Sequence, residues 1–157
     1  FDDTGQLTVV ELRSRVRRLV SRHGVDCIVV DYLQLLHWHT KTKDTLAEVS
    51  EISRGLKELA SEMQIIVLAG SQLNRSSENR EGGSPRLSDL RSSGALEQDA
   101  NVVILLDRED IRSKKPPTNI AKVIIGKNRS GPTGDIDMRW LPQWTKFADL
   151  ETRMGLE

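Results

Sequence analysis

The stretch Cys27-Ile28-Val29-Val30-Asp31-Tyr32 decides the fold that this sequence predicts. Its first four residues form a continuous apolar run rich in β-branched side chains, which is typical of a strand buried on both faces of a parallel sheet. Cys27 is the only cysteine and lies inside this run, so we expect a buried and unreactive thiol. Asp31 follows the run directly and therefore lies at the carboxyl end of the strand, where open α/β sheets bind their ligands.

Periodic segments lie on both sides of this strand. Residues 8–22 predict an amphipathic helix, with Thr8 as its cap and Glu11 three residues later. Residues 45–63 predict a second helix, and residues 65–69 predict a second buried strand. The order helix, strand, helix, strand predicts an α/β fold whose crossover connections surround a parallel sheet.

The second half of the chain is expected to be rich in strands. Residues 102–106 and 121–125 are apolar runs, and Gly131-Pro132 marks a turn. Residues 136–140 alternate apolar and polar side chains, as in a strand with one solvated face. Residues 74–88 are polar and hold two glycines and a proline, so they predict a long surface loop that is poorly ordered because it lacks apolar anchors.

Several polar and aromatic clusters also have a structural interpretation. The acidic residues Asp107, Glu109 and Asp110 are expected to belong to a solvated loop. His37-Trp38-His39 contains a possible metal pair, but no further cysteine or histidine lies nearby, which favours a structural role. Trp140 and Trp144 are expected to pack against the sheet rather than to stack on nucleic-acid bases.

Composition limits the class of protein. The chain has 157 residues, 37% of them apolar and 29% charged, which indicates one compact, soluble domain with one core. No apolar run approaches the roughly 20 residues that a membrane-spanning helix needs. The formal net charge of zero argues against a strongly basic nucleic-acid-binding surface, although a small cluster remains compatible with it. The start at Phe1 resembles the middle of a longer chain.

Three polar features follow expected strands and are candidates for a functional site. Asp31 has the form of a Walker B carboxylate, which helps to hold the Mg²⁺ on nucleotide phosphates, although an aspartate here can also cap the next turn. Gln72, in Gly70-Ser71-Gln72, can sense a phosphate or position water, or can simply satisfy a turn. Lys127 and Arg129 lie two residues apart before a tight turn. They form either an arginine-finger tip or an ordinary charged hairpin end.

Five segments together resemble the C-terminal motor domain of the DnaB family of bacterial replicative DNA helicases. They occur in the family's order and spacing and span about residues 1–150. The segments are Val30-Asp31-Tyr32-Leu33-Gln34-Leu35, Ile52-Ser53-Arg54-Gly55-Leu56-Lys57, Ser71-Gln72-Leu73-Asn74-Arg75, Ser88-Asp89-Leu90-Arg91-Ser92-Ser93-Gly94-Ala95-Leu96-Glu97-Gln98-Asp99-Ala100 and Gly126-Lys127-Asn128-Arg129-Ser130-Gly131-Pro132-Thr133-Gly134.

The resemblance implies a fold and a set of roles. It implies a partial RecA-like three-layer α/β domain over residues 1–157, with a central mostly parallel sheet and antiparallel strands at its C-terminal edge. Asp31 would serve the Mg²⁺, and Gln72 would couple the γ-phosphate of ATP to the DNA loops. Lys127 and Arg129 would act on the ATP of the next subunit in a homohexameric ring. Arg91 and Gly94 would lie in the loop that grips single-stranded DNA.

Two departures from the family qualify these roles. The family usually has glutamate where this chain has Ser92, so a contact at that position does not carry over. No Gly-x-x-x-x-Gly-Lys-Ser/Thr phosphate loop occurs in these residues, and in the family this loop, the catalytic glutamate and a primase-contacting domain would precede Phe1. We therefore expect the isolated 157-residue chain to be inactive. The family also implies a primase and a helicase loader as partners, in the bacterial cytoplasm at the replication fork, without a membrane.

Two other functions are compatible with the same residues. One is a RecA-type recombinase or clock-type ATPase, against which the segments 89–100 and 127–132 argue. The other is a non-catalytic oligomerisation or DNA-binding module that naturally lacks the phosphate loop. Strand-exchange activity distinguishes the first from a helicase. A glycine-rich loop with Lys-Ser/Thr upstream of Phe1 would exclude the second.

Overall fold

A computed structural model describes residues 1–5, 7–38, 45–74, 83–90, 94–113 and 115–150. The chain divides into two compact units. The first unit comprises residues 1–74 and 90–100, and the second comprises residues 75–89 and 101–157. Most of the expected loop 74–88 lies outside the described residues, so its order stays a prediction.

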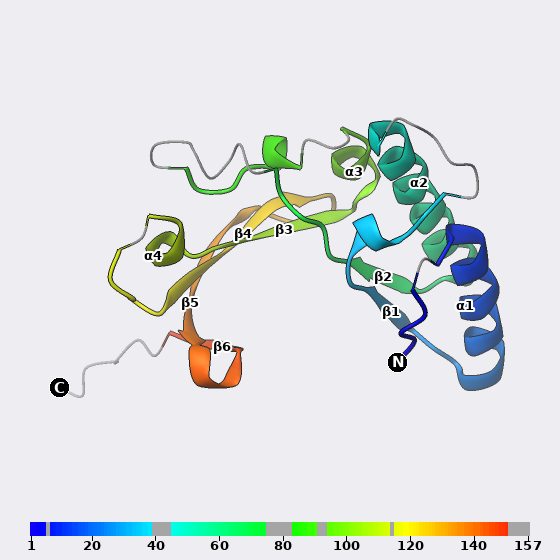
Figure 1. Ribbon diagram of the computed structural model, residues 1–157, viewed down its shortest axis with the longest axis horizontal. Helices are drawn as coiled ribbons and strands as arrows, with labels where there is room; N and C mark the ends of the chain where they lie inside the picture. Colours follow the sequence, from blue (N-terminus) through cyan, green and yellow to red (C-terminus); the bar gives the residue numbers. More distant parts are fainter. Residues whose placement is uncertain (6, 39–44, 75–82, 91–93, 114, 151–157) are drawn as a thin grey trace. The chain divides into compact units, whose positions relative to one another are not determined.

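The first unit begins with helix α1, Val9–His23 (Figure 1). Thr8 and Glu11 form the predicted capping box, in which each residue's side chain accepts a hydrogen bond from the other's backbone N–H. Gly24 ends the helix in the left-handed conformation, with φ of 63°, where glycine has no Cβ penalty. The helix predicted over residues 8–22 is confirmed.

A parallel strand pair forms the centre of the first unit. Strand β1, Cys27–Val30, pairs with β2, Ile66–Ala69, and helix α2, Thr45–Met63, connects them. The predicted second helix and both strands are confirmed, as is their parallel pairing. The short 3-10 turn Leu33–Leu35 follows β1 and was not expected from the periodicity.

Helices α1 and α2 pack closely on each other and on one face of the pair. A Cβ atom built on Gly55 of α2 would lie 2.7 Å from Val9 Cγ1, so a glycine permits this approach. The Glu62 carboxylate of α2 accepts hydrogen bonds from Arg13 and Arg17 of α1. The core comprises Val9, Val16, Val30, Leu33, Leu36, Ile52, Leu56, Leu59 and Ile65.

The opposite face of the strand pair is exposed, which corrects the prediction of a strand buried on both faces. Burial alternates along β1, so that Val30 is buried whereas Val29 keeps 68% of its surface exposed. Cys27 points to the same side as Val29, and its thiol is exposed rather than buried. A continuous apolar run shows no period, so the sequence could not reveal that only one face is covered.

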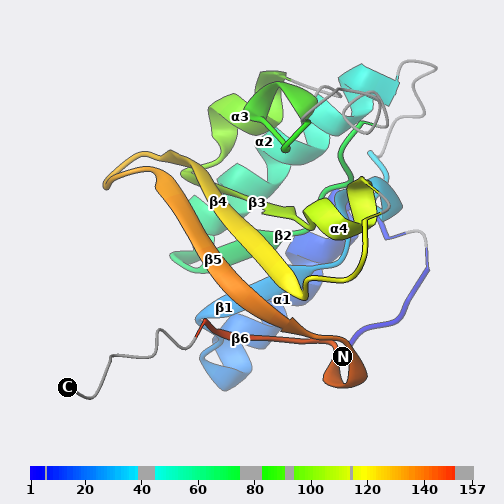
Figure 2. The same cartoon turned by 90° about the vertical axis from the view of Figure 1, so that its left-hand side faces the viewer.

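The second unit contains an antiparallel sheet. Its strands β3 (Val102–Asp107), β4 (Ile120–Asn128), β5 (Gly134–Leu141) and β6 (Lys146–Asp149) pair in chain order. Figure 2 shows β4 and β5 running side by side as a long hairpin. The predicted strands 102–106, 121–125 and 136–140 are confirmed, with longer bounds, whereas β6 was missed because its four residues are too short for a clear period.

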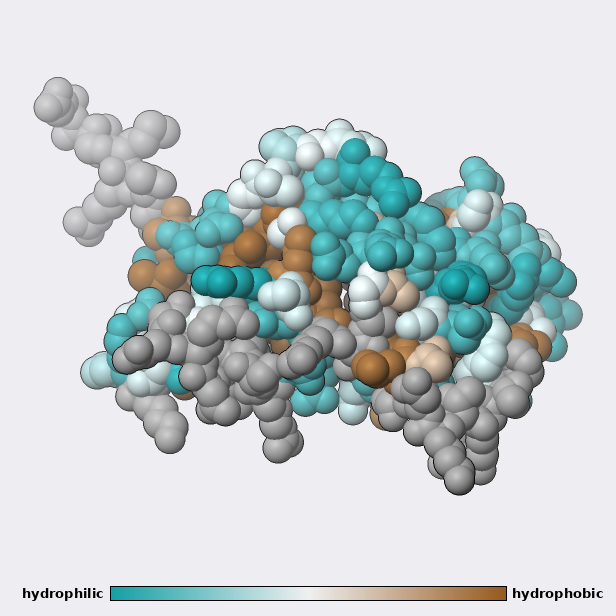
Figure 3. Space-filling model, turned by 90° about the horizontal axis from the view of Figure 1, so that it is seen from above, coloured by the Kyte–Doolittle hydropathy of each residue, from teal (hydrophilic) through white to brown (hydrophobic). Residues whose placement is uncertain are grey.

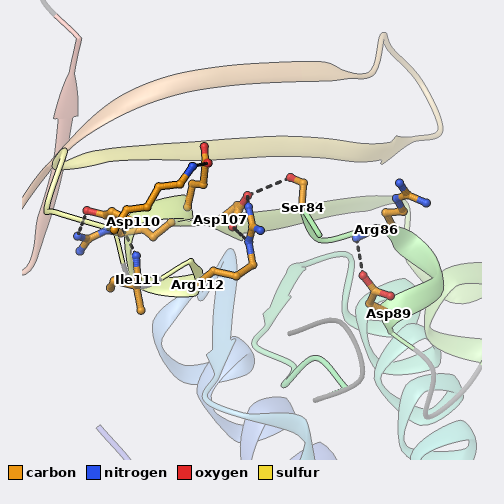
Figure 4. Close-up of polar contacts among 10 residues, drawn as sticks. Ser84, Arg86, Asp89, Asp107, Asp110, Ile111 and Arg112 are labelled. Carbon is orange, nitrogen blue, oxygen red and sulfur yellow. Dashed lines mark hydrogen bonds and ion pairs between the residues drawn. The ribbon is translucent and has the colours of Figure 1, made fainter. Parts of the chain in front are cut away.

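The acidic residues after β3 are not a solvated loop. Asp107 and Asp110 are 8% and 4% exposed, and only Glu109 is exposed. Arg112 donates two hydrogen bonds to Asp107, at 3.1 and 3.2 Å, and Ser84 donates a third at 3.0 Å (Figure 4). Helix α4, Glu109–Arg112, brings these partners together.

Arg108 and Asp110 form a second buried pair beside the first. Arg108 donates two hydrogen bonds to Asp110, at 3.2 and 2.8 Å, and its guanidinium lies 5.6 Å from the centre of the Trp140 ring. The pKa of Asp110 is lowered to about 2, mainly by the hydrogen bond from Arg108 and further by backbone N–H groups, against the effect of burial. Pairing with arginines makes burial of these carboxylates possible.

The tryptophans differ in their surroundings. Trp140 contacts Phe147 edge to face, with ring centres 4.9 Å apart, and Trp38 packs against the core of the first unit. Trp144 is 68% exposed in the short turn Pro142–Trp144, so its predicted packing on the sheet is wrong. Hydrophobic residues also lie among hydrophilic ones on the face shown in Figure 3. Within the described residues, no helix has the length and apolar character needed to cross a membrane.

Candidate functional site

The candidate site of the first unit lies at the carboxyl ends of β1 and β2. Val30 pairs with Ala69 in the parallel register, which places Asp31 beside Gly70 at the same edge. The side chain of Asp31 is exposed there, and so is that of Gln72. The structure thus brings two of the predicted site residues to one edge of the strand pair, as the carboxyl ends of parallel strands require.

Backbone hydrogen bonds hold these two strand ends together. The Gly70 N–H donates to the Val30 carbonyl at 2.9 Å, and the Gly70 carbonyl accepts from the Leu33 N–H, also at 2.9 Å. The Asp31–Tyr32 peptide bond between them is cis. A Cβ built on Gly70 would lie 3.6 Å from Asp31 Oδ1, so the backbone after β2 runs directly against the carboxylate.

Gln34 is a further polar residue at this edge, and the sequence assigned it no role. Its Nε2 donates to the Ser71 hydroxyl at 3.3 Å, beside Gln72. Its Oε1 is buried without a hydrogen-bond partner among the residues that the structure describes. Its position three residues after Asp31, in a turn returning toward β2, is the signal that points to it.

Lys127 and Arg129 lie at the hairpin between β4 and β5 in the second unit. Lys127 is half-buried and Arg129 is exposed. The Arg129 N–H donates to the Asn101 carbonyl at 2.9 Å, which fixes the backbone at the start of the turn. The Asn128 side chain donates to the Pro132 carbonyl at 3.2 Å and closes the turn. The predicted basic hairpin tip is therefore present.

The predicted DNA-contacting residues are only partly described. Arg91 lies outside the described residues, as does Ser92. Gly94 is the first residue of the short helix α3, Gly94–Asp99, and is exposed. Ser53 of α2 donates to Asp99 at 2.7 Å, which ties the end of this helix to the core of the first unit.

Acidic and histidine side chains do not form a preassembled metal centre in the part of the chain that the structure describes. No group of three or more histidine, cysteine, aspartate or glutamate side chains there can hold a metal ion. His37 lies 3.6 Å from Glu48, whereas His39 is outside the described residues. Protein-bound Mg²⁺ needs only one or two carboxylates besides phosphate and water oxygens, so the exposed carboxylate of Asp31 fits this ion.

The fold and the strand-end site define the chain as part of a RecA-like ATPase domain. One solved helicase ATPase domain superposes with a TM-score of 0.87 and 39% sequence identity, over 96% of this chain and 54% of that one. A structure of a DnaB-like replicative helicase and its interactions with primase gives a TM-score of 0.85 and 40% identity, over 96% and 37%.

The chain belongs to the DnaB-like helicase C terminal domain family, whose model matches residues 1–149. The replicative DNA helicase DnaB of Geobacillus stearothermophilus is 44% identical over 155 residues, which are 98% of this chain and 34% of the relative. The replicative DNA helicase DnaC of Bacillus subtilis has the same identity and coverage. The chain thus spans about a third of the length of these relatives.

Proposed function

We propose that this chain is one part of the RecA-like motor domain of a replicative DNA helicase, which uses ATP to move along single-stranded DNA and to unwind duplex at the fork. The chain's membership of the helicase family supports the activity. The observation that carries the site is the placement of Asp31 beside Gly70-Ser71-Gln72 at one strand edge. All residues from 1 to 157 belong to this one domain in our proposal.

In this proposal Asp31 holds the Mg²⁺ that bridges the phosphates of ATP. A bound Mg²⁺ supplies charge neutralisation on the phosphates. Asp31 orients the ion through its carboxylate, and the backbone hydrogen bonds of Gly70 keep that carboxylate at a fixed strand end. Gln72, exposed beside it, uses its side-chain amide to detect the γ-phosphate and passes its loss to the segment that follows.

Lys127 and Arg129 act in trans in our proposal. A hairpin tip with a fixed turn suits a cation that reaches across a subunit interface to the γ-phosphate held by a neighbour. The protein would then work as a homohexameric ring, since each ATP site needs residues from two subunits. Arg91 and the backbone near Gly94 hold the DNA strand by its phosphates, without reading sequence.

The isolated 157 residues do not hydrolyse ATP in this proposal, because they contain no phosphate loop. The full protein carries that activity and works with primase and a helicase loader in the bacterial cytoplasm. The experiment that tests the site is Asp31→Asn in the full-length protein, with ATP turnover measured over a Mg²⁺ series. We expect turnover to fall by at least about 100-fold while the ring still assembles. Wild-type turnover in that variant would contradict the role of Asp31.

A further inference from the structure

Strand β4 carries one extra residue immediately before Lys127. Val103 of β3 pairs with Lys127, but the next residue, Ile104, pairs with Ile125. Gly126 is therefore the unpaired residue of a β-bulge. Bulges bend a strand and redirect the side chains that follow them, and they occur often beside functional sites.

The bulge decides which face of the sheet Lys127 occupies. In an uninterrupted strand, residues 125 and 127 share one face. Here Ile125 shares a face with Ile104, which is exposed, whereas Lys127 shares a face with Val103, which is buried. The extra residue thus moves Lys127 to the buried face of β3, because a shift of one residue reverses the side of a strand's side chains.

A segment from elsewhere in the chain lies against this bulge. A Cβ built on Gly126 would meet Leu87 Cδ2 at 3.1 Å and Leu105 Cδ1 at 3.6 Å. Leu87 belongs to the short 3-10 turn Leu87–Asp89. Gly126 does not have a positive φ, so space rather than backbone conformation limits what this position can hold.

Further contacts fix residues 83–89, which we name the strap. Ser84 donates to Asp107 at the end of β3, at 3.0 Å, so the strap is held at a second point besides Leu87. The Arg86 N–H donates to the buried Asp89 at 2.8 Å and closes the turn that follows (Figure 4). Two residues beyond Asp89 the chain reaches Arg91, the proposed DNA contact.

We propose that Leu87 is a positioning residue that couples the DNA-gripping loop to the trans-acting cations. This inference rests on the proposed function of Arg91, Lys127 and Arg129. A pull on the chain at Arg91 moves the strap, and Leu87 transmits that movement to the Gly126 bulge. Because the bulge sets the face of Lys127, DNA binding adjusts the position of this cation and hence ATP turnover. Packed side chains with two discrete arrangements are a known means of such coupling.

The test uses the full-length protein and measures ATP turnover without and with single-stranded DNA. In Leu87→Ala we expect basal turnover within about twofold of wild type, and stimulation by DNA reduced about fivefold. Leu87→Met keeps most of the side-chain volume and should retain stimulation. Leu106→Ala, a leucine that is 55% exposed on the other face of β3, is the matched control and should also retain it.

A compensating pair sharpens the test. Gly126→Val places bulk against Leu87 and should reduce the stimulation, and Leu87→Ala in that background should restore part of it. A fall in thermal midpoint with an unchanged ratio of stimulated to basal turnover would overturn the coupling role, as would strictly additive effects of the two changes. Arg129→Ala is measured in parallel. If Arg129→Ala turns over ATP normally, the proposed function itself fails. If only the Leu87 variants behave like wild type, the coupling alone fails.

Discussion

The side chain of Gln34 donates a hydrogen bond of 3.3 Å to the Ser71 hydroxyl and so links the segments that follow β1 and β2. Ser71 precedes Gln72, the proposed γ-phosphate sensor, and Gln34 follows Asp31 by three residues. The two proposed ATP-contacting side chains of the first unit are thus connected by one polar contact as well as by the backbone of Gly70.

Removal of this contact should impair turnover without preventing folding. In Gln34→Ala of the full-length protein we expect ATP turnover to fall about fivefold, since one neutral hydrogen bond contributes about 1 kcal/mol. Gln34→Met, which keeps the length but not the donor, should show the same loss. Steady-state kinetics check this. A Gln34→Met enzyme as active as wild type would show that shape alone positions Ser71.

The close approach of α1 and α2 at Gly55 gives a prediction about stability. Gly55→Ala should lower the free energy of unfolding by about 1–3 kcal/mol, because the new Cβ would lie 2.7 Å from Val9 Cγ1. Thermal unfolding of the protein measures the change. Gly134→Ala is the matched control, since nothing lies within 4 Å of its Cβ position. Helix propensity alone favours alanine over glycine, so a stabilised Gly55→Ala protein would contradict the packing described.

Asp110 predicts how stability depends on acid. Its pKa in the folded chain is about 2, below the ordinary value of 3.8, chiefly because Arg108 donates to the ionised carboxylate. Since the folded pKa is the lower one, the stabilisation is fully present above about pH 4 and is lost as the pH falls toward 2. Asp110→Asn should be less stable than wild type at neutral pH, and the difference should shrink between pH 4 and 2. Urea unfolding over this range tests it, and a constant difference would contradict the pairing.

Local signals predicted the first unit well. The Thr8–Glu11 capping box, the helical period of residues 45–63 and the apolar run before Asp31 each specify an element through neighbouring residues. The placement of Asp31 near Gln72 also followed, because parallel strands end at a common edge. The failure at Cys27 has a different cause, since burial depends on which face other elements cover and a four-residue apolar run does not encode this.

The second unit was harder to predict because its main features depend on distant partners. Asp107 and Asp110 look solvated in the sequence, and only the fold brings Arg112 and Ser84 to the first and Arg108 to the second. The bulge at Gly126 depends on the register of β3, which no local pattern gives. The basic hairpin was predictable because Gly131-Pro132 marks its turn.

Two inactive variants, mixed in the full-length protein, test the central claim most directly. Asp31→Ala removes the proposed metal-binding carboxylate, and Arg129→Ala removes the proposed trans-acting cation. In a ring that combines both variants, some interfaces join an intact Asp31 to a neighbour's intact Arg129. Random assortment at equal amounts makes this about a quarter of the interfaces. We expect each variant alone to be inactive and the mixture to recover ATP turnover toward that fraction; a mixture as inactive as its components would contradict action across the subunit interface.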